Sequence, residues 1–336
     1  MAGDFVWEDA GRTVVFRRHG LKQAVAVLQG RDLVPFTLLS TSRALAGAPE
    51  LAAAAASVHD VPPGQVPELA ANLLPHAPAE SATLVALGGG RVIDVAKSVA
   101  SVGVATVVAI PTTMSGAEMS GNHRPPAGTE AEVLRRVRPQ LVIADPEAMT
   151  SQAEAQLRAS SMNALAHGVD CLYTPLANPV SAMTALRGAG LIATALDQSA
   201  AERERSDLAL GSILCGYAVD SAKFGLHHVI CQSLVRVCGT PHAETNATIL
   251  PRAASFLSSR SPDAFNELAS AIGTDLDGLE TRLLGLGGDP PGLGALGADE
   301  SRLGEAIETM LSRPELAYVP EPPSHEDLAR LLAAAW

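Results

Sequence analysis

The sequence predicts an α/β N-terminal domain built on a parallel sheet, followed by an all-α C-terminal domain, with the active-site cleft between them. Three observations predict this. Short apolar runs alternate with Ala-rich helical stretches over about the first 145 residues. Strand signals nearly vanish after Asp145. Three consecutive glycines, Gly88 to Gly90, stand between a buried strand and a helix. Alternating strands and helices pack as a parallel sheet covered by helices.

Six short apolar runs are the expected strands, at residues 13–17, 36–40, 56–60, 83–88, 105–110 and 140–144. Their apolar residues are continuous rather than alternating, which is typical of strands buried on both faces. Helical patterns fall between them at 20–29, 42–55, 64–74 and 91–101.

The second half reads as a series of helices, at 150–173, 178–197, 203–223, 224–236, 243–258, 261–272, 301–312 and 324–335. Gly- and Pro-rich stretches at 121–129 and 284–298 are expected to be loops. Because Pro146 follows the last strand, we place the boundary close to it, giving domains 1–148 and 149–336.

Composition excludes several classes of partner. The chain has 336 residues and a net charge of −12, which argues against nucleic acid or an anionic membrane as partner. A small anionic or carbonyl substrate remains compatible, since local charge decides that. The N-terminus lacks a basic region followed by an apolar core, and no apolar run suits a membrane span. The four cysteines form no C-x-x-C pair. We therefore expect a cytoplasmic protein.

The run TLVALGGGRVIDVAKSVA predicts a phosphate-binding loop. Gly88, Gly89 and Gly90 let a ligand approach the backbone, and the following helix directs free N–H groups and its positive end at a pyrophosphate. The run is not the G-x-G-x-x-G fingerprint, and a purely structural turn is the alternative. The other candidate cofactor contacts are Thr41, Asp94, Lys97, Thr112 and Thr113, of which the two last could instead cap a helix.

A second group of residues resembles a metal site. His228 and His242 stand on either side of a Gly-Thr-Pro turn, and Asn163 and His167 are spaced i, i+4 on one face of a helix. Three imidazoles suit a divalent ion, but an amide replaces the carboxylate such an ion prefers. We interpret the four as a degenerate metal site; satisfied core histidines are the alternative.

Several motifs carry a family resemblance. They are GGG-x-x-x-D-x-A-K, IPTT-x-x-G-x-E-M, NALAH, GLHH and TPHAET-x-A-x-x-LP. Together they resemble the iron-containing alcohol dehydrogenase family, and within it the maleylacetate reductases, over essentially the whole chain. The resemblance implies a homodimer that reduces maleylacetate to 3-oxoadipate with NADH or NADPH. It also puts six residues on the family's cofactor positions: Gly89, Gly90, Asp94, Lys97, Thr112 and Thr113.

The resemblance places Asn163, His167, His228 and His242 on the four positions that hold iron or zinc in the metal-dependent members. Maleylacetate reductases share the Asn, so we expect no metal. The chain departs from these reductases at Gln232, where they usually carry a His, and in the segment 121–139, which lacks a Gly- and Lys-bearing hairpin. Both departures bear on the substrate.

The expected chemistry is hydride addition to an enone. Histidines could bind a substrate carboxylate, polarise the ketone and supply a proton. We take His167, His228 and His242 for these tasks, with His228 or His242 as proton donor, Asn163 and Gln232 as polar contacts and Lys223 as a carboxylate partner.

Other functions remain open at this point. No acidic residue occupies the Ser40–Arg43 segment, so NADH and NADPH are both allowed. The chain could be a related alcohol or carbonyl dehydrogenase acting on another substrate. It could also be a non-redox NAD-binding enzyme, or a protein that kept the nucleotide fold and lost the chemistry.

Overall fold

The computed structural model describes residues 11–76, 82–103, 105–129, 132 and 134–336. These residues form two compact units that divide between Gln152 and Ala153. The N-terminal unit ends at Gln152 and the helical unit begins at Ala153, four residues beyond the predicted boundary.

The N-terminal unit is built on one six-stranded, fully parallel sheet in the order β1-β6-β5-β4-β2-β3. All six predicted strands are confirmed, with bounds that differ by at most one residue. They are β1 (Thr13–Phe16), β2 (Phe36–Ser40), β3 (Ser57–Asp60), β4 (Thr83–Gly88), β5 (Thr106–Pro111) and β6 (Leu141–Ala144).

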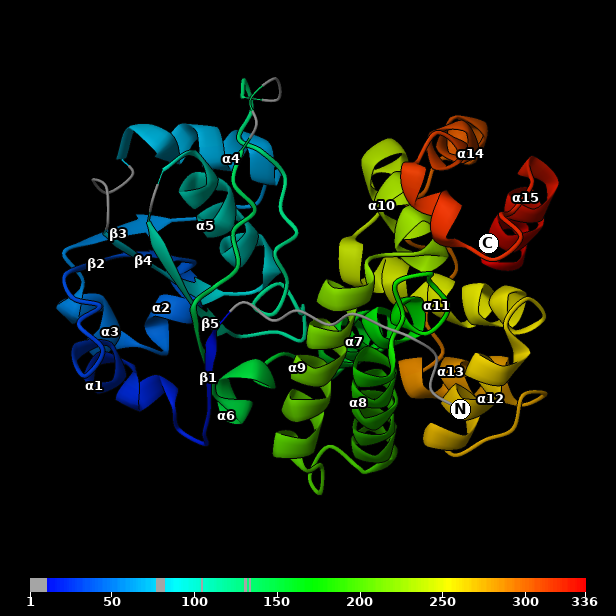
Figure 1. Ribbon diagram of the computed structural model, residues 1–336, viewed down its shortest axis with the longest axis horizontal. Helices are drawn as coiled ribbons and strands as arrows, with labels where there is room; N and C mark the ends of the chain where they lie inside the picture. Colours follow the sequence, from blue (N-terminus) through cyan, green and yellow to red (C-terminus); the bar gives the residue numbers. More distant parts are fainter. Residues whose placement is uncertain (1–10, 77–81, 104, 130–131, 133) are drawn as a thin grey trace. The chain divides into compact units, whose positions relative to one another are not determined.

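Helices cover both faces of this sheet, which explains the continuous apolar runs. On β4, Leu84 and Ala86 point into one core and Val85 and Leu87 into the other. The first core lies under α4 (Val66–Leu73) and α5 (Gly90–Val102), and the second under the three short helices on the opposite face (Figure 1). Those three are α1 (Ala24–Gln29), α2 (Ser42–Ala46) and α3 (Pro49–Ala54). The 3₁₀ turn η1 (Leu21–Gln23) lies on the same face, and the 3₁₀ turn η2 (Leu74–His76) follows α4 on the other face.

A buried lysine holds the segment that follows β5. Lys97 of α5 is fully buried, and its Nζ donates to the carbonyl oxygens of Ala117, Ser120 and Asn122 at 3.0, 3.2 and 2.6 Å. The same ammonium lies 2.7 Å from a carboxylate oxygen of Asp94. With four oxygen partners, Lys97 ties the segment 117–122 to α5.

Glu118 lies within this segment and is also fully buried. Burial raises the pKa of its carboxyl to about 7, because the charged form loses its hydration. The charge of Lys97 and the Ser115 hydroxyl, which donates to Glu118 at 3.4 Å, offset part of that effect.

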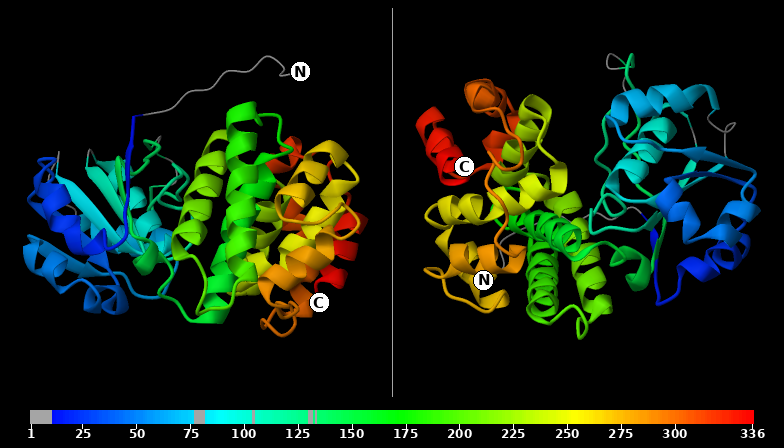
Figure 2. Two further views of the ribbon diagram at one scale, coloured as in Figure 1. Left: turned by 90° about the horizontal axis from the view of Figure 1, so that it is seen from below. Right: turned by 180° about the vertical axis from the view of Figure 1, so that it is seen from behind.

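The helical unit is arranged around α7 (Glu154–Cys171), in which every residue from Ala159 to Cys171 is buried. A helix buried all round lies inside a bundle rather than on its surface. Helices α8 (Pro179–Asp197) and α9 (Arg205–Ala222) lie beside it and are green in Figures 1 and 2. The remaining helices are α10 (Leu226–Cys238), α11 (His242–Ser258), α12 (Pro262–Ala271), α13 (Leu279–Gly287), α14 (Leu303–Leu311) and α15 (His325–Ala334), with η3 (Glu300–Arg302) and η4 (Pro314–Tyr318).

Two glycines let α8 and α9 touch backbone to backbone. A Cβ on Gly188 would lie 2.9 Å from the carbonyl oxygen of Gly211, and one on Gly211 would lie 2.8 Å from that of Gly188. Any larger residue at either position would push the two helices apart.

The loop predicted at 284–298 was wrong in its first part, because α13 runs to Gly287. Leu279, Leu283 and Leu286 form one buried stripe at helical spacing, and Gly288 ends the helix in the left-handed conformation with a φ of 72°. The sequence interpretation also missed the single turn α6 (Pro146–Met149), which the buried Asp145 side chain caps by accepting the Glu147 N–H.

Helix α8 is the one described helix that is long and apolar enough to cross a membrane. Half of its apolar window is buried inside the structure, where it packs against α7 and α9. Core helices of globular proteins pass the same test, so this is weak support for a membrane span.

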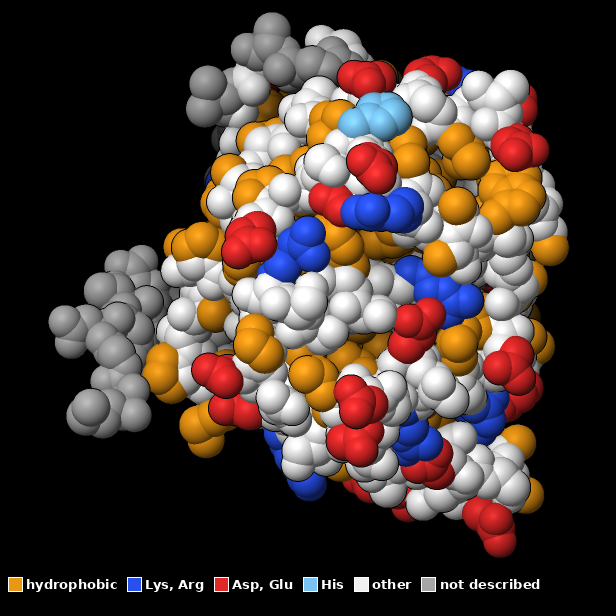
Figure 3. Space-filling view, turned by 90° about the vertical axis from the view of Figure 1, so that its right-hand side faces the viewer, with side chains coloured by type: hydrophobic (Ala, Val, Ile, Leu, Met, Phe, Trp, Pro, Cys, Tyr) orange, Lys and Arg blue, Asp and Glu red, His pale blue; other side chains and the backbone are white. Residues whose placement is uncertain are grey.

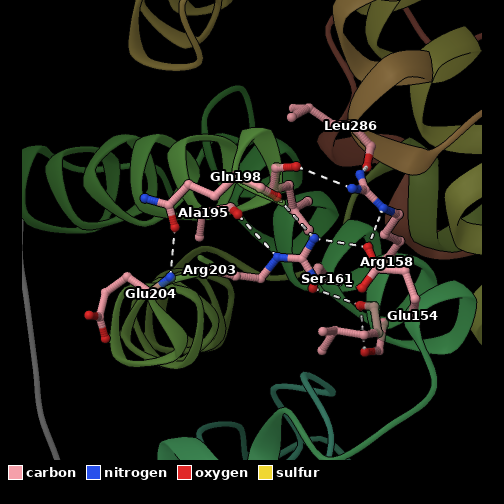
Figure 4. Close-up of polar contacts among 11 residues, drawn as sticks. Glu154, Arg158, Ser161, Ala195, Gln198, Arg203, Glu204 and Leu286 are labelled. Carbon is pink, nitrogen blue, oxygen red and sulfur yellow. Dashed lines mark hydrogen bonds and ion pairs between the residues drawn. The ribbon is translucent and has the colours of Figure 1, made fainter. Parts of the chain in front are cut away.

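Arg203 crosslinks the start of α7 to the end of α8 (Figure 4). Its guanidinium donates to both carboxylate oxygens of Glu154 at 2.6 and 2.9 Å and to the carbonyl oxygen of Ala195 at 3.1 Å. Its side chain is only 3 % exposed. This neighbour holds the pKa of the Glu154 carboxyl below its ordinary value.

Other ion pairs of the helical unit lie at the surface, where solvent weakens them. Figure 3 shows one face on which basic and acidic side chains lie next to each other. Pairs of this exposed kind include Arg302–Glu305 and Arg330–Glu326.

The burial difference between two bidentate arginine pairs gives a test. We expect Arg203→Met to lower the free energy of unfolding by about 2–3 kcal/mol, since Glu154 keeps only its pair with Arg158 and two backbone carbonyls lose a donor. Arg282→Met is the matched control, because Arg282 pairs in the same way with Asp197 but is 24 % exposed. It should cost less than about 1 kcal/mol in urea unfolding. Equal losses of unfolding free energy in the two variants would contradict a larger contribution from the buried pair.

Glu118 predicts a pH dependence of stability. Its folded pKa is raised to about 7 from 4.5, so its contribution to stability is present below pH 4.5 and is lost as the pH rises through 7. Glu118→Gln removes this titration, so the variant should gain stability relative to the wild type between about pH 5 and about pH 8. Urea unfolding at both pH values measures the difference in unfolding free energy between the variant and the wild type. Glu68→Gln, on the exposed side of α4, is the control for losing a charge. A difference that is the same at both pH values would refute this.

Candidate functional site

The glycine loop lies where the direction of strand connection reverses. From β4 the chain passes to its neighbour β5 on one side, whereas β2, its neighbour on the other side, passes outward to β3. Ligands of open α/β sheets bind at the carboxyl ends of strands at such a point. Gly88 ends β4, Gly89 precedes α5 and Gly90 begins it, so the N-terminus of a 13-residue helix stands at this edge.

The glycines also allow the segment after β5 to lie against the loop. A Cβ on Gly89 would lie 3.0 Å from Cγ2 of Thr113, and one on Gly90 would lie 3.0 Å from Cβ of Ser115. The buried hydroxyl of Thr113 has no hydrogen-bond partner among the described residues. An unsatisfied buried hydroxyl next to a glycine loop suits an oxygen-rich ligand such as a phosphate.

The other predicted cofactor residues have partners inside the unit. The Thr41 hydroxyl accepts the Ala44 N–H at 3.3 Å and so caps α2, and the Thr112 N–H donates to the Gly88 carbonyl at 2.9 Å. Asp94 and Lys97 pair with each other. The four residues therefore stabilise the N-terminal unit itself. Their contact with a nucleotide stays a prediction.

In the helical unit, α7 and α10 bring two of the predicted histidines together. The rings of His167 and His228 stack with centroids 4.7 Å apart and planes inclined by 10°. Phe224 stacks on His228 with centroids 4.4 Å apart. Asn163 is one turn before His167 on α7 and, like both histidines, is buried.

His242 completes the group from a third helix. It is the first residue of α11, follows Pro241, and is exposed. It lies close enough for its charge to lower the pKa of His167 and His228. The helical unit therefore brings together three of the predicted imidazoles.

Asp170 is a residue of this site that the sequence interpretation missed. It is fully buried on α7, and one carboxylate oxygen, Oδ2, accepts from Nδ1 of His228 at 2.7 Å, from the backbone N–H of His228 at 3.3 Å and from that of Gly225 at 2.9 Å. The other, Oδ1, accepts from the hydroxyl of Tyr173. Its spacing of three residues after His167 puts it on the same side of the helix, which is the signal that could have found it.

Asp170 and Tyr173 together cap the start of α10. This helix begins after Gly225, which has no side chain to satisfy the free N–H groups of a first turn. The hydroxyl of Tyr173 accepts the Leu226 N–H at 2.7 Å while it donates to Asp170. A Cβ on Gly225 would overlap the Tyr173 hydroxyl, so glycine is required here.

His227 is part of the core rather than of the site. Its Nε2 lies 3.2 Å from the carbonyl oxygen of Asn246 and 3.4 Å from Sγ of Cys231. Its ring meets His228 edge-on with centroids 4.9 Å apart. Burial lowers the pKa of His227 to about 3, with the charge of His228 as the next cause.

Burial also keeps the two stacked histidines neutral. It is the main cause that lowers the pKa of His228, and it holds the pKa of His167 well below its ordinary value. Nε2 of His228 and Nδ1 of His167 are buried without a hydrogen-bond partner among the described residues. These two ring nitrogens of the helical unit could therefore contact a ligand.

The structure offers two sets of atoms for a metal. In one, ring nitrogens of His227 and His228 and an oxygen of Asp170 lie within 4.8 Å of one another, but each already takes part in the hydrogen bonds described above. The other set is the predicted degenerate site, which holds no carboxylate: Asn163, His167, His228 and His242. Its unpartnered ring nitrogens fit a borderline ion such as zinc, whereas its amide weakens binding of a hard one.

Gln232 and Lys223 have distinct surroundings. Gln232 is one turn after His228, and its side-chain oxygen accepts from Arg313 at 3.0 Å, an arginine that also pairs with Glu315. The substrate contact predicted for Gln232 would have to share that oxygen. Lys223 ends α9 with a φ of 70°, which is strained for a residue other than glycine, and directly precedes Phe224.

Family profiles match nearly the whole chain. "Iron-containing alcohol dehydrogenase" matches residues 13–152, and "Fe-containing alcohol dehydrogenase family, C-terminal" matches residues 158–336. Maleylacetate reductase 1 of Rhodococcus opacus is 32 % identical over 76 % of this chain and 73 % of its own length. Maleylacetate reductase 2 of Cupriavidus pinatubonensis is 31 % identical over 84 % of this chain and 81 % of its own.

Solved structures of the same family have the same fold. An iron-containing alcohol dehydrogenase of Corynebacterium glutamicum superposes with a TM-score of 0.89 at 30 % identity, covering 100 % of this chain and 97 % of that one. A maleylacetate reductase of Agrobacterium tumefaciens gives 0.86 at 26 % identity, covering 99 % and 98 %. The predicted fold class and the predicted family are both confirmed. The chain is an oxidoreductase and belongs to the iron-containing alcohol dehydrogenase family.

Proposed function

We propose that this protein reduces maleylacetate to 3-oxoadipate with NADH or NADPH, without a metal ion. The observation that carries the proposal is the neutral polar group formed by Asn163, His167 and His228, which stands where the family's metal-dependent members hold their ion. The substrate is taken from the relatives, several of which are named maleylacetate reductase and are about 30–33 % identical to this chain.

The N-terminal unit supports a dinucleotide as the hydride source. Gly89 and Gly90 leave the first turn of α5 open, and the Thr113 hydroxyl beside them has no partner among the described residues. The segment after β2 carries Ser40, Thr41 and Ser42 and no carboxylate. A carboxylate there would repel the 2′-phosphate of NADPH, so both nucleotides are compatible.

The reaction needs a hydride, a proton and stabilisation of one developing charge. Hydride from the nicotinamide C4 adds to the alkene carbon β to the ketone, and the electron pair of the double bond moves to the ketone oxygen as an enolate. The enolate then takes a proton at the adjacent carbon, which leaves a saturated ketone and oxidised nucleotide. Donors at the enolate oxygen and a proton source lower the barrier.

We divide these tasks among the histidines as follows. We take Nδ1 of His228 to donate a hydrogen bond to Asp170. Nε2 is then an acceptor, so His228 is poorly suited to donate a proton to the substrate. His242 is exposed and stands at the start of α11, so we assign the proton transfer to it. Lys223 is the proposed partner of a substrate carboxylate, and His167 contacts the substrate through its unpartnered nitrogen.

A second candidate is reduction of another carbonyl compound by the same residues. It is favoured by Gln232, which contacts Arg313 where maleylacetate reductases usually carry a His, and by the similarity to the Corynebacterium glutamicum alcohol dehydrogenase. A cytoplasmic homodimer is part of either proposal, and the homodimer is taken from the family resemblance.

The first test is oxidation of NADH and of NADPH with maleylacetate and with a panel of aldehydes and ketones. We expect maleylacetate to give the highest kcat/KM, and His242→Ala to lower kcat by about 10²–10⁴-fold because the proton donor is lost. His325→Ala, which removes an exposed histidine from α15, is the control and should leave kcat unchanged. A higher kcat/KM for an aldehyde would favour the second candidate, and an undiminished kcat in His242→Ala would exclude its role.

The second test concerns the metal. We expect the wild-type enzyme to keep its kcat after dialysis against a chelator, and Asn163→Asp to raise the affinity for Zn²⁺ by roughly tenfold or more, since a carboxylate adds a charge next to the ion. Calorimetric titration measures both proteins. In the double variant with His228→Gln the gain should disappear. Loss of activity on chelation, with recovery on adding Zn²⁺ or Fe²⁺, would refute metal independence.

A further inference from the structure

We propose that Asp170 is a positioning residue that fixes His228 in the tautomer protonated on Nδ1, so that Nε2 faces the reaction as a hydrogen-bond acceptor. This inference rests on the proposed function for its catalytic meaning. The tautomer itself follows from contacts inside the helical unit and does not depend on the substrate.

The first argument is the set of partners around Asp170. A backbone N–H of Gly225 and one of His228 can only donate, and both reach Oδ2. A proton on Oδ2 would collide with these donors. The remaining contact of the same oxygen, Nδ1 of His228 at 2.7 Å, is therefore a donor too.

Tyr173 closes the other end of the carboxylate. Its hydroxyl oxygen accepts the Leu226 N–H, so its proton is directed at Oδ1 of Asp170. Burial raises the pKa of this hydroxyl well above 10, so the proton stays on the tyrosine. Both oxygens of Asp170 thus receive protons from their neighbours, and neither carries one.

The second argument comes from His227 and is independent of Asp170. Nε2 of His227 lies 3.2 Å from the Asn246 carbonyl oxygen, which can only accept, so this nitrogen carries the proton. Nδ1 of neutral His227 is then bare and lies 3.4 Å from Nδ1 of His228. A bare nitrogen in that place also favours a proton on Nδ1 of His228, because two bare nitrogens would repel each other.

As a consequence, Nε2 of His228 can accept a hydrogen bond but cannot donate one. That hydrogen bond can come from a protonated donor or a water molecule, and the stacking contacts of His228 with His167 and Phe224 hold the ring plane. Removing the carboxylate would let the proton move to Nε2 and turn the acceptor into a donor without moving the ring.

The direct test is ¹⁵N NMR of histidine-labelled protein, with the His228 signals identified among the nine histidines by their loss in His228→Gln. We expect Nδ1 to give the signal of a protonated ring nitrogen and Nε2 that of an unprotonated one. The opposite pattern would overturn the proposal. This measurement needs no substrate, so it stands even if the enzyme fails to reduce maleylacetate.

Two variants then separate positioning from folding. Asp170→Asn should shift the His228 proton towards Nε2 and lower kcat by about 10- to 100-fold on whichever substrate the enzyme reduces, with a smaller change in KM. Tyr173→Phe is the matched control, because it breaks contacts of the same buried network but leaves the His228–Asp170 contact in place. It should keep the wild-type ¹⁵N pattern and most of kcat.

The result that would overturn the inference is a common loss of kcat in Asp170→Asn and Tyr173→Phe that follows their loss of stability. An unchanged tautomer in Asp170→Asn, together with a large loss of kcat, would overturn it as well. If Asp170→Asn does not fold, the wild-type tautomer and the Tyr173→Phe spectrum decide the question.

Discussion

The carboxylate of Asp170 is the contact on which the rest of the histidine site depends. Buried charges persist in proteins where several donors surround them, and this one receives four. Three of the donors belong to the start of α10 or to the histidine it carries, and the fourth belongs to Tyr173. One side chain of α7 therefore sets where α10 begins, how His228 is turned and which of its nitrogens is open. Glycine at position 225 is part of the same arrangement, because a side chain there would displace Tyr173.

The negative charge of this site lies beside His228 rather than at position 163. At position 163, where the family resemblance places an anionic ligand, the chain has an amide, and the acidic group lies instead behind His228 at position 170. A carboxylate behind an imidazole makes its far nitrogen a better acceptor. Hydrogen bonds thus hold the His228 ring in place, and Nδ1 of His167 and Nε2 of His228 have no hydrogen-bond partner among the described residues.

Local patterns in the sequence were enough to predict the sheet and most helices, whereas the roles of the site residues stay predictions. Buried strands and glycine loops have patterns that can be recognised within a few residues of sequence. The i, i+4 pair of Asn163 and His167 is another such pattern. Contacts between distant segments have no such local pattern, which is why Asp170 was missed. The same reason explains why Lys97 was expected at a nucleotide although it binds three carbonyls of segment 117–122, and why the Arg313 partner of Gln232 could not be foreseen. Helix α13 was obscured by the glycines that end it.

Helix α7 carries Asn163, His167 and Asp170, and none of its residues from Ala159 to Cys171 reaches the surface. Exposed residues of α7 lie only in its first turns, before Ala159. The burial of the rest of α7 is consistent with a fold shared at TM-scores of 0.86 and 0.89 by proteins only 26 % and 30 % identical to this one. For protein engineering it means that the outer helices can be redesigned for solubility or assembly while the chemistry is left alone. Under the proposed function, a change of substrate would begin with the residues around His242 and Lys223, which stand at the ends of helices.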